Sequence, residues 1–156
     1  MGLGKTLQVV ALVHTLIAHQ ELTKTKRVLI ILPKNGLSNW MNEFKSWTKN
    51  CKHKVPIQTF PHYPVTKQHL ECLEKWHERG GVFLMSFNIF TRLISNKNHP
   101  DLFEKYLIQP GADLVCFDEG HILKSEATNI SKSLAIVSTS RRIVTTGKYN
   151  QLRKLL

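Results

Sequence analysis

Short apolar runs rich in β-branched residues alternate along the chain with longer stretches in which apolar residues recur every three or four positions. The first pattern is typical of buried strands and the second of helices with one buried face. Their alternation predicts repeated strand–helix units and a parallel sheet covered by helices, which is the α/β class. We expect strands at 28–32, 56–60, 82–86, 113–117 and 141–145, and helices at 5–19, 38–47, 67–78, 88–94 and 127–137.

The chain is strongly basic, and much of its charge lies in one segment. Lys and Arg number 22 against 11 Asp and Glu, a formal charge of +11. A soluble domain with this excess usually meets a polyanion, although charge alone does not distinguish DNA from RNA or anionic lipid. Residues 21–54 contain two acids and eight bases, the bases being Lys24, Lys26, Arg27, Lys34, Lys45, Lys49, Lys52 and Lys54. We therefore expect the electrostatic contact there.

Other composition features restrict the location and the metal chemistry. No apolar run approaches the roughly 18 residues of a membrane span, and the N-terminal residues lack the apolar core of a signal peptide. Cys51, Cys72 and Cys116 are scattered without C-x-x-C spacing, which does not fit a structural zinc site and suits a reducing compartment. We expect a soluble intracellular protein without a membrane partner.

The chain opens with a string that has the ending of a phosphate-binding loop. Gly2, Leu3, Gly4, Lys5 and Thr6 are followed at once by a helical pattern. Glycines allow backbone N–H groups to approach phosphate oxygens, and a helix N-terminus adds partial positive charge. The lysine can reach the outer phosphates and the threonine can reach Mg²⁺. Five residues alone are weak evidence for a phosphate-binding loop, so this interpretation depends on a partner, a second nucleotide-binding motif elsewhere in the chain.

Two acids follow the fourth expected strand and supply that partner. Residues 114–117 are apolar, and Asp118 and Glu119 come directly after them. At the end of a buried strand the first acid can hold Mg²⁺ and the second can orient or deprotonate an attacking water. An acid pair by itself is more often the start of a solvated loop. The order of the phosphate loop, the acid pair and a third polar strand end at 145–147 favours a nucleotide site.

Four strings resemble the motifs of one ATPase family. Residues 1–6, 32–44, 118–124 and 141–147 are similar to motifs I, Ia, II and III of the Swi/Snf-type chromatin-remodelling ATPases of helicase superfamily two. The sequences Gly-His-Ile-Leu-Lys in motif II and Asn-Trp-Met-Asn-Glu-Phe in motif Ia are similar to those of the ATRX-like branch. The resemblance spans nearly the whole chain.

The resemblance implies a fold and an activity. The fold is α/β, a three-layer RecA-like P-loop NTPase lobe with a mainly parallel sheet. The ligands are ATP and Mg²⁺, and the activity is DNA-stimulated ATP hydrolysis coupled to tracking along double-stranded DNA. The implied partners are double-stranded DNA and nucleosomes or chromatin, in the nucleus. Residues 1–156 would form the first of two RecA-like lobes, incomplete at both ends, with the second lobe absent.

Matched position by position, the resemblance assigns the nucleotide chemistry to motifs I and II. Binding of the phosphates falls on Gly2, Leu3, Gly4, Lys5 and Thr6. Thr6 and Asp118 would hold Mg²⁺, and Glu119 would activate the attacking water beside Asp118.

The same matching assigns DNA contact and coupling to other residues. Four polar residues of motif Ia would contact the phosphate backbone: Lys34, Asn35, Ser38 and Asn39. Four residues of motifs II and III would couple the nucleotide site to the DNA: His121, Thr145, Thr146 and Gly147. Such phosphate contacts are independent of base sequence and sensitive to salt. The motif Ia residues fall inside the basic segment 21–54.

The sequence departs from the family pattern in three places. The strand that normally precedes the phosphate loop is absent, residues 148–152 replace the usual Thr-Pro-Leu-Gln-Asn, and the second lobe with its arginine finger is absent. Because an arginine finger contributes roughly 10³ to 10⁵ in rate, we expect the isolated chain to be a poor ATPase or inactive. We also expect one side of the strand at 141–145 to be uncovered.

Alternatives to the translocase remain. One is an RNA helicase of the same superfamily, although such helicases more often have Ala at the position of Gly120. Another is a non-catalytic or non-functional fragment that acts at most as a DNA- or chromatin-binding module. Trp40 and Trp47 could stack on bases, but their spacing of seven residues on one expected helix favours burial against the sheet.

Overall fold

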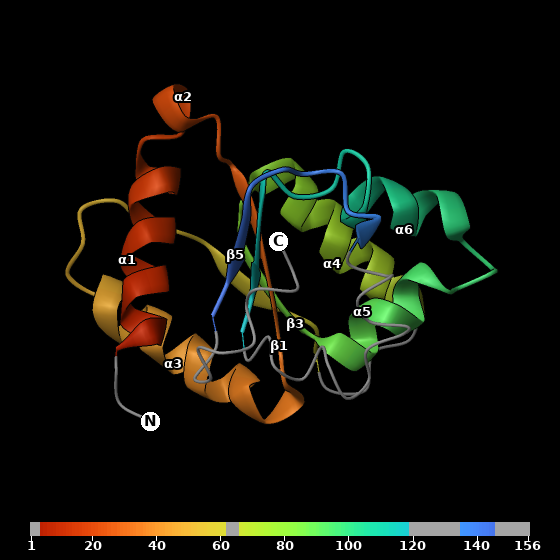
Figure 1. Cartoon of the computed structure of the whole chain (residues 1–156), viewed down its shortest axis with the longest axis horizontal. Helices are drawn as coiled ribbons and strands as arrows, with labels where there is room; N and C mark the ends of the chain where they lie inside the picture. Colours follow the sequence, from red (N-terminus) through yellow and green to blue (C-terminus); the bar gives the residue numbers. More distant parts are fainter. Residues whose placement is uncertain (1–3, 62–65, 119–134, 146–156) are drawn as a thin grey trace.

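A parallel five-stranded sheet forms the centre of the molecule (Figure 1). The computed structural model describes residues 4–61, 66–118 and 135–145. The strand order is β2-β3-β1-β4-β5, and every neighbouring pair is parallel. The strands are β1 (Arg27–Leu32), β2 (Ile57–Thr59), β3 (Gly81–Ser86), β4 (Leu114–Phe117) and β5 (Arg142–Val144). The five strands and the parallel sheet predicted from the apolar runs are confirmed.

Helices cover both faces of this sheet, which makes three layers (Figure 1). One face carries α1 (Lys5–Ala18) and α3 (Leu37–Thr48). The other face carries α4 (Thr66–Arg79), α5 (Phe87–Ile94) and α6 (Pro100–Leu107). Two short turns lie between these elements, α2 (Gln20–Thr23) and the 3-10 turn η1 (Lys34–Gly36).

Most of the predicted helices are confirmed. Four agree with the structure to within one residue at each end, those at 5–19, 38–47, 67–78 and 88–94. The helix expected at 127–137 falls mostly outside the residues that the structure describes. α2 and α6 were not predicted, because α2 has only four residues and α6 begins at a proline after an irregular polar stretch. None of the helices in the described ranges is long and apolar enough to cross a membrane.

Each face of the sheet packs its own hydrophobic core, because successive side chains of a strand point to opposite faces. In β1, Leu29 and Ile31 join the core beneath α4, α5 and α6. Val28, Ile30 and Leu32 join the core beneath α1 and α3. All five side chains are fully buried. Burial on both faces explains why this strand is apolar at every position after Arg27.

The two tryptophans of α3 differ in burial. Trp40 is buried, and its ring centroid lies 6.2 Å from that of Phe44, which is also buried. Trp47 is 52% exposed, and its Nε1–H donates to Glu43 Oε2 at 2.6 Å. The prediction of burial is therefore confirmed for Trp40 and wrong for Trp47. Trp40 and Phe44 fill the positions beneath the helix, whereas Trp47 pairs along the helix surface with a residue four positions earlier.

One carboxylate anchors β1 and β4 to each other at their amino ends. Asp113 Oδ2 accepts hydrogen bonds from the backbone N–H groups of Lys26 at 2.9 Å and Arg27 at 2.7 Å. Asp113 Oδ1 accepts from the Arg27 guanidinium at 2.9 Å. Burial alone would raise the pKa of Asp113, but the hydrogen bonds from Arg27 and Lys26 outweigh it and lower the pKa. The anchor sets the register of two strands whose other ends reach the candidate site.

β5 lies at one edge of the described sheet. Among the residues with a described structure, it pairs with β4 and has no strand on its other side. That side faces α1 across a pocket.

Candidate nucleotide site and nucleic-acid interface

The carboxyl ends of the strands and the start of α1 meet at one edge of the sheet. Because the strands are parallel, β1, β4 and β5 all end on the lower side in Figure 1, where α1 also begins. Lys5, the first residue of α1, therefore lies at the same end of the sheet as Asp118 and Thr145, which follow β4 and β5. Open parallel sheets bind their ligands at this edge.

Asp118 is held in position by hydrogen bonds to three elements. Its backbone N–H donates to the carbonyl of Ile31 in β1 at 3.0 Å. Its carboxylate accepts from Trp40 Nε1 at 2.7 Å through Oδ2, and from Thr145 Oγ1 at 2.7 Å through Oδ1. A carboxylate oxygen has two lone-pair sites, so a hydrogen bond to it does not by itself prevent it from binding a cation. The hydrogen bonds from Trp40 and Thr145 fix the orientation of the Asp118 carboxylate at the end of β4.

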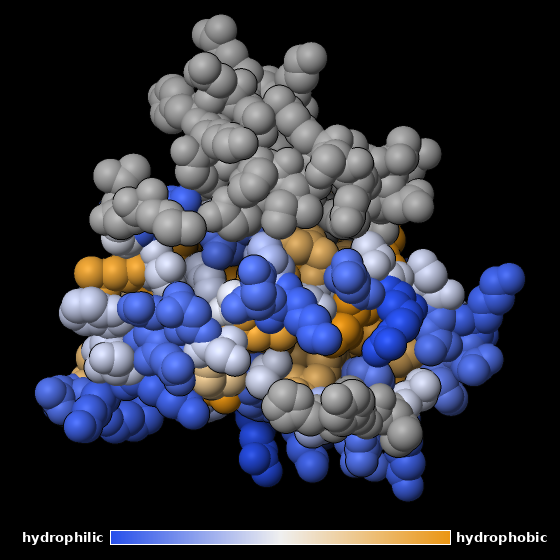
Figure 2. Space-filling view, turned by 90° about the horizontal axis from the view of Figure 1, so that it is seen from below, coloured by the Kyte–Doolittle hydropathy of each residue, from blue (hydrophilic) through white to orange (hydrophobic). Residues whose placement is uncertain are grey.

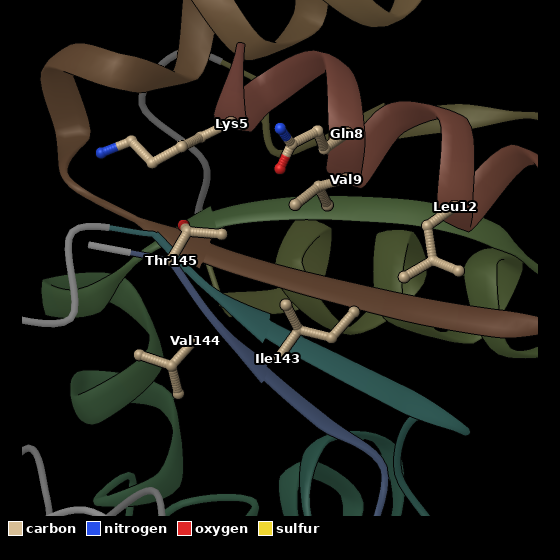
Figure 3. A pocket seen from close by; sticks show the side chains of 7 residues that line it. All are labelled: Lys5, Gln8, Val9, Leu12, Ile143, Val144 and Thr145. Carbon is tan, nitrogen blue, oxygen red and sulfur yellow. The ribbon is translucent and has the colours of Figure 1, made fainter. Parts of the chain in front are cut away.

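A pocket of about 350 Å³ separates α1 from β5. Lys5 and Thr145 lie toward one end of it and Leu12 toward the other (Figure 3). Gln8, Val9 and Ile143 lie between these ends, and Val144 lies at the Thr145 end with its side chain directed away from α1 (Figure 3). The pocket thus has a polar end, where the lysine and the threonine hydroxyl lie, and an apolar body.

The start of α1 fits the phosphate groups of a nucleotide. Gly4, which precedes the helix, has a left-handed φ of 62°, and none of the described side chains caps the helix N-terminus. Among the described residues, a Cβ at Gly4 would meet nothing within 4 Å. The first N–H groups of a helix lack intrahelical partners and favour an anion. Lys5 and the half-buried Thr6 follow directly, and Asp118 supplies the kind of oxygen ligand that Mg²⁺ prefers.

The predicted site residues are brought together to different extents. Lys5 and Thr145 line one pocket, and Thr145 bonds Asp118. Thr6 lies beside Lys5 in the first turn of α1 but does not line that pocket. Six predicted residues lie outside the described part of the chain: Gly2, Leu3, Glu119, His121, Thr146 and Gly147.

The four predicted DNA-contacting residues are exposed at the carboxyl end of β1. Lys34 and Asn35 belong to η1, and Ser38 and Asn39 lie in the first turn of α3. They lie at the same edge of the sheet as Asp118, since η1 directly follows β1. Figure 2 views the molecule from below, toward this edge, and hydrophilic side chains form much of the surface that is coloured there.

The cysteine next to this site is not reactive. Cys116 in β4 is fully buried, and burial, together with the charge of Asp118, raises its pKa to about 12. Such a thiol stays protonated at neutral pH and packs as a small hydrophobe. Within the ranges that the structure covers, no three His, Cys, Asp or Glu side chains come together as a metal site. The chemistry of this edge rests on a carboxylate, hydroxyls and a lysine.

One contact at the site was not predicted from the sequence. The indole of Trp40 bonds Asp118, although the two residues are 78 positions apart. The helical period predicts that Trp40 is buried, but nothing local indicates which acceptor its N–H meets. The preference of a buried indole N–H for a hydrogen-bond partner is the only signal that could have prompted a search.

The fold and the edge just described define a class of protein. A parallel sheet covered on both faces by helices, with α1 starting beside the strand ends, is a three-layer RecA-like P-loop NTPase lobe. The sequence matches the SNF2-related domain over residues 1–151. The chain therefore belongs to the SNF2-related family.

Individual relatives agree with this assignment. The chain is 40% identical to "Transcriptional regulator ATRX homolog" of Drosophila melanogaster, over 99% of its length and 12% of the relative. It is 36% identical to "Transcriptional regulator ATRX" of Homo sapiens, over 94% of its length and 6% of the relative. The chain thus spans a small part of these proteins, and the resemblance to the ATRX-like branch is confirmed.

A solved structure supports the fold. The Sulfolobus solfataricus SWI2/SNF2 ATPase core in complex with dsDNA superposes with a TM-score of 0.68 at 20% identity. The match covers 99% of this chain and 28% of that one.

Proposed function

We propose that this chain is the ATP-binding lobe of an ATP-dependent double-stranded-DNA translocase that remodels chromatin in the nucleus. The observation that carries the proposal is the Asp118 carboxylate, fixed by Thr145 at the edge of the sheet where α1 begins with Lys5. Membership of the SNF2-related family supports an ATPase of the helicase type. The names of the relatives, transcriptional regulators, support a chromatin role.

The residues of the sheet edge have distinct roles in this function. The N–H groups at the start of α1 bind phosphate oxygens, and Lys5 neutralises the outer phosphates. Thr6 and Asp118 would hold Mg²⁺, and the bound ion would neutralise charge on the transferring phosphoryl group. Glu119, the residue after Asp118, orients the attacking water. Thr145 keeps the Asp118 carboxylate aligned for its ligand.

DNA meets the lobe at η1 and the start of α3. Lys34 supplies charge for a phosphate, and the polar side chains of Asn35, Ser38 and Asn39 are exposed beside it. The SWI2/SNF2 neighbour, which was solved with double-stranded DNA, supports this class of partner. The residues that follow β4 and β5, His121, Thr146 and Gly147, couple this surface to the nucleotide site.

Binding of ATP to the chain tests the nucleotide site. We expect weak, Mg²⁺-dependent binding, and we expect Lys5→Ala to weaken it at least about tenfold, because hydrogen bonds to charged groups contribute about 1.5 to 3 kcal/mol. Isothermal titration with and without Mg²⁺ measures this. Lys75→Ala is the control, because Lys75 is exposed on α4, on the opposite face of the sheet. Equal affinities for the Lys5→Ala and Lys75→Ala chains would refute the nucleotide site.

Salt-dependent binding of duplex DNA tests the other surface. We expect Lys34→Glu to weaken binding and to reduce the slope of log affinity against log salt by about one, since one fewer phosphate is neutralised. Fluorescence anisotropy at several salt concentrations gives the slope. Lys75→Glu, with the same change of charge, is expected to have a smaller effect.

The outcome of the DNA titration also separates the alternatives. If the affinity for duplex DNA changes neither with salt nor with Lys34→Glu, then η1 and the start of α3 are not the DNA-binding surface. Preference for single-stranded RNA over duplex DNA would favour an RNA helicase. Binding of DNA without any binding of ATP would favour a non-catalytic DNA- or chromatin-binding module.

A further inference from the structure

The hydrogen bond between Trp40 and Asp118 joins two surfaces that have separate roles in the proposed function. Trp40 belongs to α3, which begins at the DNA-contacting turn, whereas Asp118 belongs to the nucleotide site. The distance from Trp40 Nε1 to Asp118 Oδ2 is 2.7 Å, and the Trp40 side chain is 2% exposed. An indole N–H can only donate, so the partner must be an acceptor. A bond to a carboxylate is stronger than one between neutral groups.

Trp40 holds one of the two oxygens of the Asp118 carboxylate. Thr145 Oγ1 bonds Oδ1 and Trp40 Nε1 bonds Oδ2, so the two donors together set the plane of the Asp118 carboxylate. Thr145 follows β5 and is part of the sheet, whereas Trp40 lies on a helix that packs on the sheet. A displacement of α3 therefore moves one of the two donors and not the other.

The turn that precedes α3 lies close to the indole. A Cβ built on Gly36, the last residue of η1, would lie 3.8 Å from Trp40 Cδ1 and 2.9 Å from Leu32 Cδ1. The space of about one methyl group separates the Gly36 backbone from the indole. Within α3, the Trp40 and Phe44 ring centroids lie 6.2 Å apart, and both side chains are buried. Because η1 ends at Gly36 and α3 begins at Leu37, Trp40 lies in the first turns of the helix that continues the DNA-contacting turn, and a shift of the start of α3 carries the closely packed indole with it.

We propose that Trp40 is a positioning residue that aligns the Asp118 carboxylate and transmits DNA contact at η1 to the nucleotide site. The inference rests on the proposed function for the identity of the two ligands. The hydrogen bond itself does not depend on it. DNA bound at η1 shifts the start of α3, the indole moves with it, and Oδ2 of Asp118 is turned toward or away from its ligand.

The three indole N–H groups of the chain allow a direct test by NMR spectroscopy. Trp→Phe substitutions assign the signals of Trp40, Trp47 and Trp76. In the free chain, we expect Asp118→Ala to shift the Trp40 signal and to speed its exchange with water about tenfold, the effect of losing one hydrogen bond to a charged group. Asp118→Asn, which keeps an acceptor oxygen, should restore part of the protection. The Trp76 signal should stay unchanged, because that N–H donates to the Gly81 carbonyl at 3.0 Å.

Addition of duplex DNA at low salt tests the transmission. We expect the Trp40 signal to shift as DNA binds and the Trp76 signal to stay in place. Lys34→Glu should remove the shift together with the binding. In MgATP titrations, Trp40→Phe is expected to lower the Mg²⁺-dependent affinity about tenfold, as for other residues that orient a metal ligand. Trp76→Phe, which removes an equally buried indole donor elsewhere, should leave that affinity unchanged.

The outcomes of these experiments test different parts of the proposal. If Asp118→Ala leaves the Trp40 signal unchanged, the positioning role is wrong. If bound DNA leaves the Trp40 signal unchanged, the transmission is wrong. Equal losses of MgATP affinity in Trp40→Phe and Trp76→Phe mean that Trp40 is merely structural. If the unsubstituted chain binds neither DNA nor MgATP, the titrations themselves reveal the failure of the proposed function. The Asp118→Ala spectra of the free chain still decide whether Trp40 positions Asp118.

Discussion

The 156-residue chain is expected to hydrolyse ATP at least about 10³-fold more slowly than the same lobe within a two-lobe protein, with no stimulation by DNA. Lys5 is the sole charged residue that lines the pocket among the described residues. Charge that develops on the transferring phosphoryl group has to be neutralised from both sides of the cleft. By resemblance to the family, a second lobe supplies cationic groups from the other side, including an arginine finger.

A chimaera measures this difference in one background. The chain replaces the matching segment of the Drosophila relative, to which it is 40% identical, and ATPase rates are compared with and without duplex DNA. The chimaera should show DNA-stimulated hydrolysis that Lys5→Ala abolishes, whereas the 156-residue chain should not. The unsubstituted relative serves as the positive control. Robust DNA-stimulated hydrolysis by the short chain, lost in Lys5→Ala, would show that one lobe is sufficient.

Gly81→Ala is expected to destabilise the fold by about 2 to 5 kcal/mol, the sum of backbone strain and of overpacking. Gly81, at the start of β3, has a φ of 93°, a conformation that residues with a Cβ rarely adopt. A Cβ at this position would lie 2.4 Å from the Pro56 carbonyl oxygen. That oxygen cannot move away cheaply, because it accepts a hydrogen bond from the Val82 N–H at 2.8 Å. The strand pairing of β3 therefore opposes relief of the clash.

Gly4→Ala separates the strain from the clash. Gly4 also has a positive φ, 62°, but a Cβ there would meet no atom of the described part of the chain within 4 Å. Gly4→Ala should lower the free energy of unfolding by about 1 to 2 kcal/mol, the contribution of backbone strain alone. Urea denaturation of both variants gives the comparison. A smaller loss for Gly81→Ala than for Gly4→Ala would show that the approach of Pro56 to β3 is not a constraint.

Much of the fold could be predicted because its strands and helices follow from local patterns of apolar residues. β1 and β3 are buried at nearly every position, so their sequences are continuous apolar runs. α3 and α4 repeat their apolar positions over three turns or more. α6 was missed since it begins at Pro100 and follows an irregular polar stretch, whereas α5, of the same length, directly follows the apolar run of β3. Trp47 was assigned to the wrong environment, because spacing on a helix does not reveal where the core beneath it ends.

Local sequence patterns and motifs were sufficient to predict the five strands, four of the helices, the family, and which residues stand at the strand ends. These properties depend on side chains that are near one another along the chain or on motifs that can be matched position by position. Parallel strands ending at one edge then required Lys5, Asp118 and Thr145 to be near one another. The contact between the Trp40 indole and Asp118, 78 residues away, became evident only from the three-dimensional packing. That contact depends on where α3 lies across the ends of β1 and β4, which is set by packing rather than by a local pattern.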